Sequence, residues 1–132
     1  MPGAYRANLL DSSGMLLTRI RFWVNTWPGT LPQVWTAKRT YRVGQPVVAR
    51  WKNAPGNRWD WVCISTRGTG PGSCWTWRYT NASIAGKRQL DRREPTPGWG
   101  PQWWPLPAGR YTVYLMRDDG YVMLAKGHFR VI

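Results

Sequence analysis

Few side chains in this chain could transfer a proton. The 132 residues include one histidine, His128, and one glutamate, Glu94, although histidine and carboxylates do most general acid and base catalysis. The adjacent carboxylates of Asp118-Asp119-Gly120 fit a turn, and His128 fits an ordinary position in a strand. The candidate nucleophiles lack a nearby base to activate them: Ser65, Ser73 and Ser83. We therefore expect the protein not to be an enzyme.

The sequence also offers few side chains that could bind a metal or a cofactor. Cys63 and Cys74 are the two cysteines of the chain, and with a single histidine they fit no four-ligand zinc pattern. We expect neither a metal nor a cofactor.

Tryptophan and arginine point instead to binding. The chain has eleven tryptophans and fifteen arginines, two residue types that are enriched where proteins make their strongest contacts. A formal net charge of +13 predicts a positive field over much of the surface. Acidic glycans and other polyanions are therefore candidate partners. No run of residues approaches the roughly 18 apolar positions of a membrane span.

The elements that position these residues are predicted to be β-strands. Alternation with a period of two dominates, and eleven prolines with fourteen glycines punctuate it. The clearest early strand covers residues 16–24 and is amphipathic. Its apolar side comprises Leu16, Ile20, Phe22 and Val24, and its other side Leu17, Arg19, Arg21 and Trp23. We expect the apolar side to be buried and the arginines to be exposed.

The chain divides into two parts. Residues 1–33 form an N-terminal extension, made of the early strand and a linker rich in proline and glycine. Residues 34–132 carry the remaining strands and should form a single β domain, since a chain of this length holds one core. The segment 82–107 is the least regular and ends in a tryptophan tract. A long loop of this kind is usually functional or packed as a unit.

The two cysteines flank a predicted hairpin. If residues 59–65 pair with 74–80 so that Cys63 faces Cys74, a cross-strand disulfide is natural. That register places Val62, Ile64, Trp75, Trp77 and Tyr79 on the core face. The opposite face then holds Trp59, Trp61, Cys63, Cys74, Thr76 and Arg78. Indole rings on an outward face are either covered by another segment or offered to a partner.

From about residue 34 onward the chain resembles a bacterial immunoglobulin-like β-sandwich module of secreted proteins. The matching motifs are Tyr41-Arg42-Val43-Gly44-Gln45-Pro46-Val47-Val48, the run from Trp51 to Val62, Trp77-Arg78-Tyr79, the run from Pro105 to Tyr111, and Asp119-Gly120-Tyr121. The resemblance implies an immunoglobulin-like antiparallel β-sandwich that serves as an accessory module, with no catalytic residues to carry over. The chain departs from the pattern in having no attached enzyme and in its extra N-terminal strand.

Self-assembly is the leading functional hypothesis: a non-enzymatic subunit of an extracellular filament, tube or coat. The strand with Leu16, Ile20, Phe22 and Val24 could be donated to a neighbouring subunit, or it could fold back onto its own sandwich. The candidate interface comprises Arg19, Arg21, Trp23, Trp59, Trp61, Arg78, Trp99, Trp103 and Trp104. We expect a homo-oligomer or polymer at the cell surface or outside the cell, although the chain begins without a signal-peptide pattern.

Two alternatives remain open. A carbohydrate-binding module would use Trp59, Trp61, Trp99, Trp103 and Trp104 as platforms for sugar rings, with the positive charge favouring acidic glycans. A nucleic-acid or anion-binding β-sandwich would use arginines along the backbone and tryptophans to stack on bases.

Overall fold

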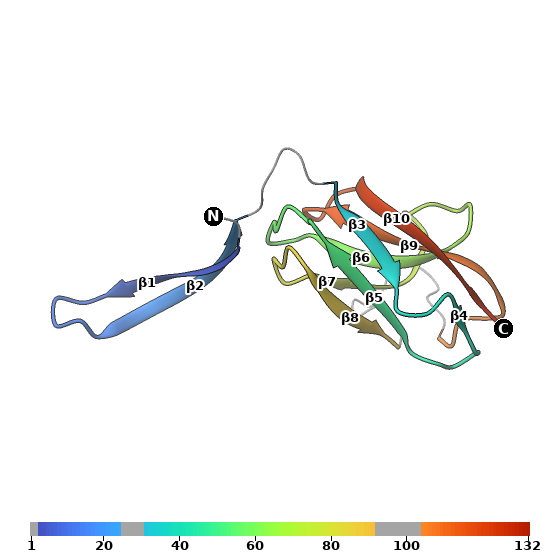
Figure 1. Cartoon of the computed structure of the whole chain (residues 1–132), viewed down its shortest axis with the longest axis horizontal. Helices are drawn as coiled ribbons and strands as arrows, with labels where there is room; N and C mark the ends of the chain where they lie inside the picture. The colour runs from blue at the N-terminus through green and yellow to red at the C-terminus, as the bar shows by residue number, and fades with distance from the viewer. Residues whose placement is uncertain (1–2, 25–30, 92–103) are drawn as a thin grey trace.

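The protein is all-β, as predicted. A computed structural model describes residues 3–24, 31–91 and 104–132, and these residues form strands and loops without a helix (Figure 1). The strands are β1 (Gly3–Leu10), β2 (Leu16–Val24), β3 (Gln33–Thr36), β4 (Thr40–Tyr41), β5 (Val47–Lys52), β6 (Trp61–Thr66), β7 (Cys74–Tyr79), β8 (Gly86–Leu90), β9 (Gly109–Arg117) and β10 (Val122–Val131).

Eight of these strands build two sheets that pack face to face as a β-sandwich. One sheet has the order β4-β10-β9-β6-β7 and the other β3-β5-β8. All pairings between neighbours are antiparallel except that of β4 with β10, which is parallel. Period-two alternation places every second side chain between the sheets.

The main core lies between the two sheets. Val47, Ala49 and Trp51 extend inward from β5, and Val62 and Ile64 extend inward from β6. Tyr111 and Phe129 stack across β9 and β10 with their ring centroids 5.6 Å apart. The core is closed, because most of its aliphatic side chains have no solvent exposure.

The N-terminal strand lies outside both sheets of the sandwich. β2 pairs with β1 in a separate two-stranded hairpin, and Figure 1 shows this hairpin extending away from the sandwich. The alternation in residues 16–24 correctly predicts β2, but its partner β1 was not anticipated. The expectation that β2 buries its apolar side is wrong within one chain, because a two-stranded ribbon has no second layer to cover it.

The β6–β7 hairpin differs in register from the prediction. Cys63 lies opposite Trp77, and Cys74 lies opposite Ser65, with an irregularity at Ile64 and Ser65 that leaves Trp75 as the extra residue. Such a bulge reverses the faces of the residues beyond it.

Because of the bulge, four residues of β7 lie on the face opposite to the predicted one. Trp77 and Tyr79 share the outward face with Trp61 and the cysteines. Thr76 and Arg78 lie on the inward face, opposite Ile64 and Val62 respectively.

The two sheets lie close together where β10 packs against β3. A Cβ atom added at Gly127 would lie 2.7 Å from the carbonyl oxygen of Val34 and 3.4 Å from the Cα of Trp35. Because both neighbours are backbone atoms, neither can move without shifting β3.

We expect Gly127→Ala to destabilise the fold by about 1–3 kcal/mol through this overlap. The measurement is the free energy of unfolding from a urea titration. Gly72→Ala is the matched control, because a Cβ at Gly72 meets nothing within 4 Å. Equal stability of the two variants would contradict the close packing of β3 on β10.

Candidate functional site

The β1–β2 hairpin has one apolar face. The cross-strand pairs Tyr5 with Phe22 and Ala7 with Ile20 lie on it, and the rings of Tyr5 and Phe22 stack with centroids 5.6 Å apart. Ile20 is 66% exposed, Leu9 58% and Phe22 42%. A contiguous exposed apolar surface usually marks a contact with a partner.

The opposite face of the hairpin is basic. Arg6 lies directly opposite Arg21, and Arg19 lies opposite Asn8. Arg19 and Arg21 are therefore on the face that the sequence predicted for them. Arg21 also lines a pocket with residues of β8 that include Lys87 and Arg88. Trp23 lies in β2 opposite Ala4, but its side chain is outside the described part of the structure.

A carboxylate organises the tip of the hairpin. Asp11 accepts hydrogen bonds from the backbone amides of Ser13 and Met15 and from the Ser13 hydroxyl. These bonds lower the pKa of Asp11, so the carboxylate stays ionised and fixes the turn. The tip carries further exposed apolar side chains: Leu10, Met15, Leu16 and Leu17.

A second cluster of side chains lies on the outward face of the five-stranded sheet. Trp61, Tyr114 and Met116 are buried in it beside the disulfide between Cys63 and Cys74, whose Cα atoms are 5.8 Å apart. The predicted disulfide is thus present. Trp77 and Tyr79 pack against this aromatic cluster.

Trp61 belongs to this cluster and not to an open interface. It is only 8% exposed, its ring meets the edges of Trp77 and Tyr121, and its indole Nε1 donates to the carbonyl of Gly120. The sequence left open whether the indole rings on this face are covered by another segment or offered to a partner. Trp61 is covered.

Among the predicted tryptophans whose side chains the structure describes, Trp59 is the exposed one, at 41%. The guanidinium carbon of Arg58 lies 4.6 Å from the centroid of its ring, and Tyr79 packs on it at 5.2 Å. A sugar approaching the ring face under Arg58 would have to displace the guanidinium, which weakens the case for Trp59 as a stacking platform.

Other predicted interface residues serve the fold. The half-buried Arg78 donates from Nη1 to the carbonyl of Trp77 and to the Thr76 hydroxyl, so its prediction as an outward contact is wrong. The reason is the bulge, which places it on the core side. Trp104 packs against the main core. Trp99 and Trp103 lie outside the described residues.

A buried carboxylate connects the loops around the aromatic cluster. Asp60 has no solvent exposure and accepts hydrogen bonds from the Asn57 backbone amide, the Asn57 side-chain amide and the Asp118 backbone amide. Its own carbonyl accepts from the Thr80 amide and hydroxyl. Asp60 therefore joins the loop before β6, the β9–β10 turn and the residue after β7.

Burial, acting against these hydrogen bonds, raises the pKa of Asp60 above its ordinary value of 3.8, and the nearby Asp118 charge adds to the rise. An elevated carboxyl pKa can mark a catalytic acid. Here all three hydrogen bonds to the carboxylate come from neighbouring loops, which assigns Asp60 a structural role. The guanidinium of Arg58, two residues before Asp60, lies over the ring of Trp59.

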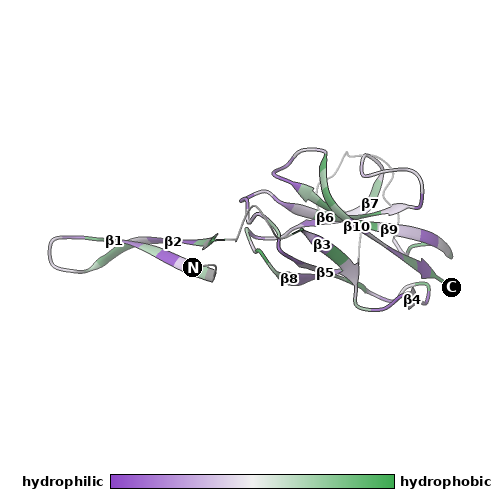
Figure 2. Cartoon of the chain, turned by 45° about the horizontal axis from the view of Figure 1, so that its top comes forward, coloured by the Kyte–Doolittle hydropathy of each residue, from purple (hydrophilic) through white to green (hydrophobic). Residues whose placement is uncertain are grey.

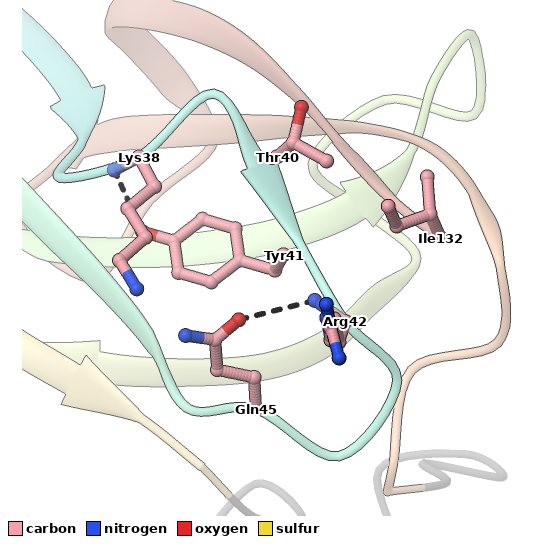
Figure 3. A pocket seen from close by; sticks show the side chains of 6 residues that line it. All are labelled: Lys38, Thr40, Tyr41, Arg42, Gln45 and Ile132. Atoms are coloured by element: carbon pink, nitrogen blue, oxygen red, sulfur yellow. Dashed lines mark hydrogen bonds between the residues drawn. The ribbon is translucent and has the colours of Figure 1, made fainter.

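A cationic pocket lies at the β4 edge of the sandwich. Figure 3 shows its six lining residues: Lys38, Thr40, Tyr41, Arg42, Gln45 and Ile132. Its volume is about 470 Å³. The Tyr41 hydroxyl accepts from the Lys38 amide, and the Gln45 side-chain oxygen accepts from the Arg42 amide. This pocket was not foreseen, because its residues come from a strand of two residues, the loops on either side of it, and the residue that follows β10.

Sequence reasoning also missed the apolar residues of β1. Tyr5, Ala7 and Leu9 alternate with Arg6 and Asn8, and this alternation is the signal that could have revealed the strand.

Neither metal ligands nor a spanning helix is found in the part of the chain that the structure describes. It has no group of three histidine, cysteine or acidic side chains that could hold a metal ion. It also has no helix long and apolar enough to cross a membrane.

The chain matches no protein-family model and no curated protein in sequence comparisons. The resemblance of residues 34–132 to an immunoglobulin-like module therefore remains a prediction, whereas the β-sandwich itself is observed.

We expect Asp60→Asn to destabilise the protein by about 1–3 kcal/mol, because an amide cannot accept from all the donors that surround the carboxylate. The urea midpoint at neutral pH measures the effect. Asp118→Asn is the control: Asp118 is exposed, and its left-handed backbone at φ 44° suits asparagine. A wild-type midpoint for Asp60→Asn would refute the role of Asp60 in joining the loops.

The raised pKa of Asp60 also predicts a pH dependence. In the window above 3.8 the folded chain holds a proton that the unfolded chain releases, so this stabilising contribution is present at low pH and is lost as the pH rises. Relative to Asp60→Asn, the wild-type unfolding free energy should fall between about pH 3.5 and the folded pKa. The Asp118→Asn variant should show most of the same fall in unfolding free energy. A difference that instead grew with pH would show that the folded pKa is lowered.

Proposed function

We propose that this protein is a non-enzymatic structural subunit that associates with copies of itself through the β1–β2 hairpin. The exposed apolar face of that hairpin, with Leu9, Ile20, Phe22 and Val24, is the observation that carries the proposal. Figure 2 shows the apolar and polar residues interspersed along both strands.

An isolated two-stranded ribbon is marginally stable in water, and it gains stability when another layer covers its apolar face. The sandwich of the same chain does not supply that layer, since its own sheets are complete and neither includes β1 or β2. A second hairpin offers the same surface in return, which is how symmetric protein interfaces are built.

The mode of contact follows from the pairing of β2. One edge of β2 is occupied by β1, and the sandwich core is already filled by side chains such as Val47 and Leu115. Insertion of a lone strand into a neighbouring core is therefore less suitable than packing of one ribbon against another. The apolar faces meet in this arrangement, and the arginine faces point outward.

An extracellular setting is part of the proposal. The disulfide between Cys63 and Cys74 supports it, because such bonds persist mainly in oxidising compartments. Trp59 and Tyr121 are exposed beside the aromatic cluster and would be available for further contacts in a larger assembly.

The double variant Ile20→Thr/Phe22→Thr should weaken self-association at least tenfold, because burial of each apolar side chain is worth about 1.5–3 kcal/mol. Threonine preserves the tendency to form a strand. The measurement is the dissociation constant from sedimentation velocity over a concentration series, with negative-stain electron microscopy to identify ordered polymers. Arg19→Thr/Arg21→Thr is the matched control, because it makes the same replacements on the opposite face of β2.

A chain with residues 1–30 deleted serves as the reference without a hairpin. This truncated chain should be monomeric at the same concentrations. Added salt should leave wild-type association unchanged or strengthen it, because it screens the repulsion between chains of net charge +13. If the truncated chain assembles as the full chain does, or if both double variants behave alike, the hairpin is not the contact.

A further inference from the structure

The sheet register brings cations together on the outward face of the sandwich. Arg130 of β10 lies directly opposite Arg110 of β9, and the amide of Arg67 donates to the carbonyl of Arg110. The inward positions beside Arg110 and Arg130 are held by the core residues Tyr111 and Phe129, so alternation directs these two exposed arginines outward. Arg67 directly follows β6 and is also exposed. Since neighbouring strands are about 4.8 Å apart, these arginines form a row across the sheet.

Lys126 adds a fourth cation to this row. It lies on β10 opposite Tyr114, which belongs to the outward aromatic cluster. His128 lies between Lys126 and Arg130 along the same strand, and burial together with the charges of Arg67 and Lys126 lowers its pKa. The basic stripe is defined by Arg67, Arg110, Lys126 and Arg130.

The stripe continues into the cationic pocket at the β4 edge. Thr40 lies opposite Arg130, and its hydroxyl accepts a hydrogen bond from the Nε of Arg130. Thr40 also lines the pocket (Figure 3), to which Lys38 and Arg42 contribute their charges. The pocket therefore adjoins the basic stripe through Thr40, and the two together define the basic track, from the pocket across β10 and β9 to Arg67.

Among the described residues, the acidic side chains near this sheet lie at its other end. Arg110 is near the start of β9, whereas Asp118 and Asp119 directly follow the end of that strand. Asp60 hydrogen-bonds to the amide of Asp118 there. The outward face is therefore polarised along its strands, with carboxylates beside the aromatic cluster and cations beside the pocket.

We infer that this track binds a linear acidic polysaccharide, a polymer that carries sulfate or carboxylate groups at regular intervals. Arginine favours such anions because its planar guanidinium donates two parallel hydrogen bonds to them. Binders of single-stranded nucleic acid combine a basic groove with exposed aromatic rings for stacking. Among the described residues, the aromatic side chains of β4, β9 and β10 are all buried: Tyr41, Tyr111, Tyr114 and Phe129. Their burial favours a polymer recognised through charge.

This inference is independent of the proposed self-association, because it uses no residue of the hairpin. A monomeric protein with residues 1–30 deleted could still bind the polymer. Conversely, a self-assembling protein could lack the polymer site. Binding should therefore be measured on both the full chain and the truncated chain.

Isothermal titration calorimetry with dextran sulfate and with polyuronate tests the inference, with neutral dextran and a thymidine oligonucleotide as comparison probes. At low salt the wild-type chain should bind one or both acidic polymers and not neutral dextran. Arg110→Gln/Arg130→Gln should weaken that binding by about tenfold or more. It should also reduce the slope of log affinity against log salt, since fewer counterions are released.

Arg50→Gln/Lys87→Gln is the matched control. These two exposed residues form a cross-strand pair of cations on the other sheet, so the control removes the same charge from the opposite side of the sandwich. It should change the affinity by less than about threefold. Melting curves of both variants should lie close to the wild type, because all four side chains are exposed and the hydrogen bond from Arg130 to Thr40 is itself at the surface.

Three results would overturn the inference. Equal losses in the two double variants would show that the overall positive field binds the polymer. Absence of binding to both acidic polysaccharides at low salt would remove the site. Tighter binding of the oligonucleotide than of either polysaccharide would assign the track to nucleic acid.

Discussion

The buried carboxylate of Asp60 connects the loops at the end of the sandwich where the aromatic cluster lies. Its hydrogen bonds join the loop before β6 to the β9–β10 turn, and its carbonyl receives Thr80 after β7. Trp59, Trp61 and Tyr121 all belong to these connected segments. An uncompensated buried charge is costly, so the three hydrogen bonds to this side chain fix the positions of the loops as well as stabilising them.

The outward face of the five-stranded sheet consequently has two chemically different ends. At the end nearer Asp60, the aromatic rings of the cluster and the disulfide pack against one another, so little of the ring surface is exposed to solvent. Beside the β4 edge, arginines from three neighbouring segments are exposed without that cover. Rigid strands hold both ends in place, which makes this face suited to binding an extended partner by charge while its aromatic end stays folded.

The hairpin presents the opposite physical situation. Arg6 of β1 lies directly opposite Arg21 of β2, a pairing of like charges that costs energy in a ribbon, and the apolar side of the hairpin lacks a second layer. A second copy would cover the apolar side but would also bring together two chains of net charge +13. An acidic polymer bound along the basic track would relieve that repulsion. The two proposals are thus compatible, although neither requires the other.

Much of the fold follows from local chemistry. Alternation with a period of two predicts β2, β5 and the strands of the β9–β10 hairpin, because it is typical of extended segments whose two faces differ, and the Asp-Gly pair at 119–120 suits a tight turn. The two cysteines correctly indicate a disulfide. Alternation cannot show that Trp77 faces outward and Arg78 inward, since the bulge at Trp75 shifts the pairing. Nor does it locate the partner of β2, because an amphipathic strand pairs as well with a hairpin neighbour as with a sheet.

The sequence by itself determined the strand content, the disulfide and the excess of tryptophan and arginine, since these depend on residue type and short-range spacing. Tertiary structure decided which tryptophans are buried, which loops Asp60 joins, and that Arg67, Arg110 and Arg130 lie side by side. Their proximity depends on the registers between strands that are far apart in the chain. Those registers are set by the packing of the whole core, and no local pattern encodes them.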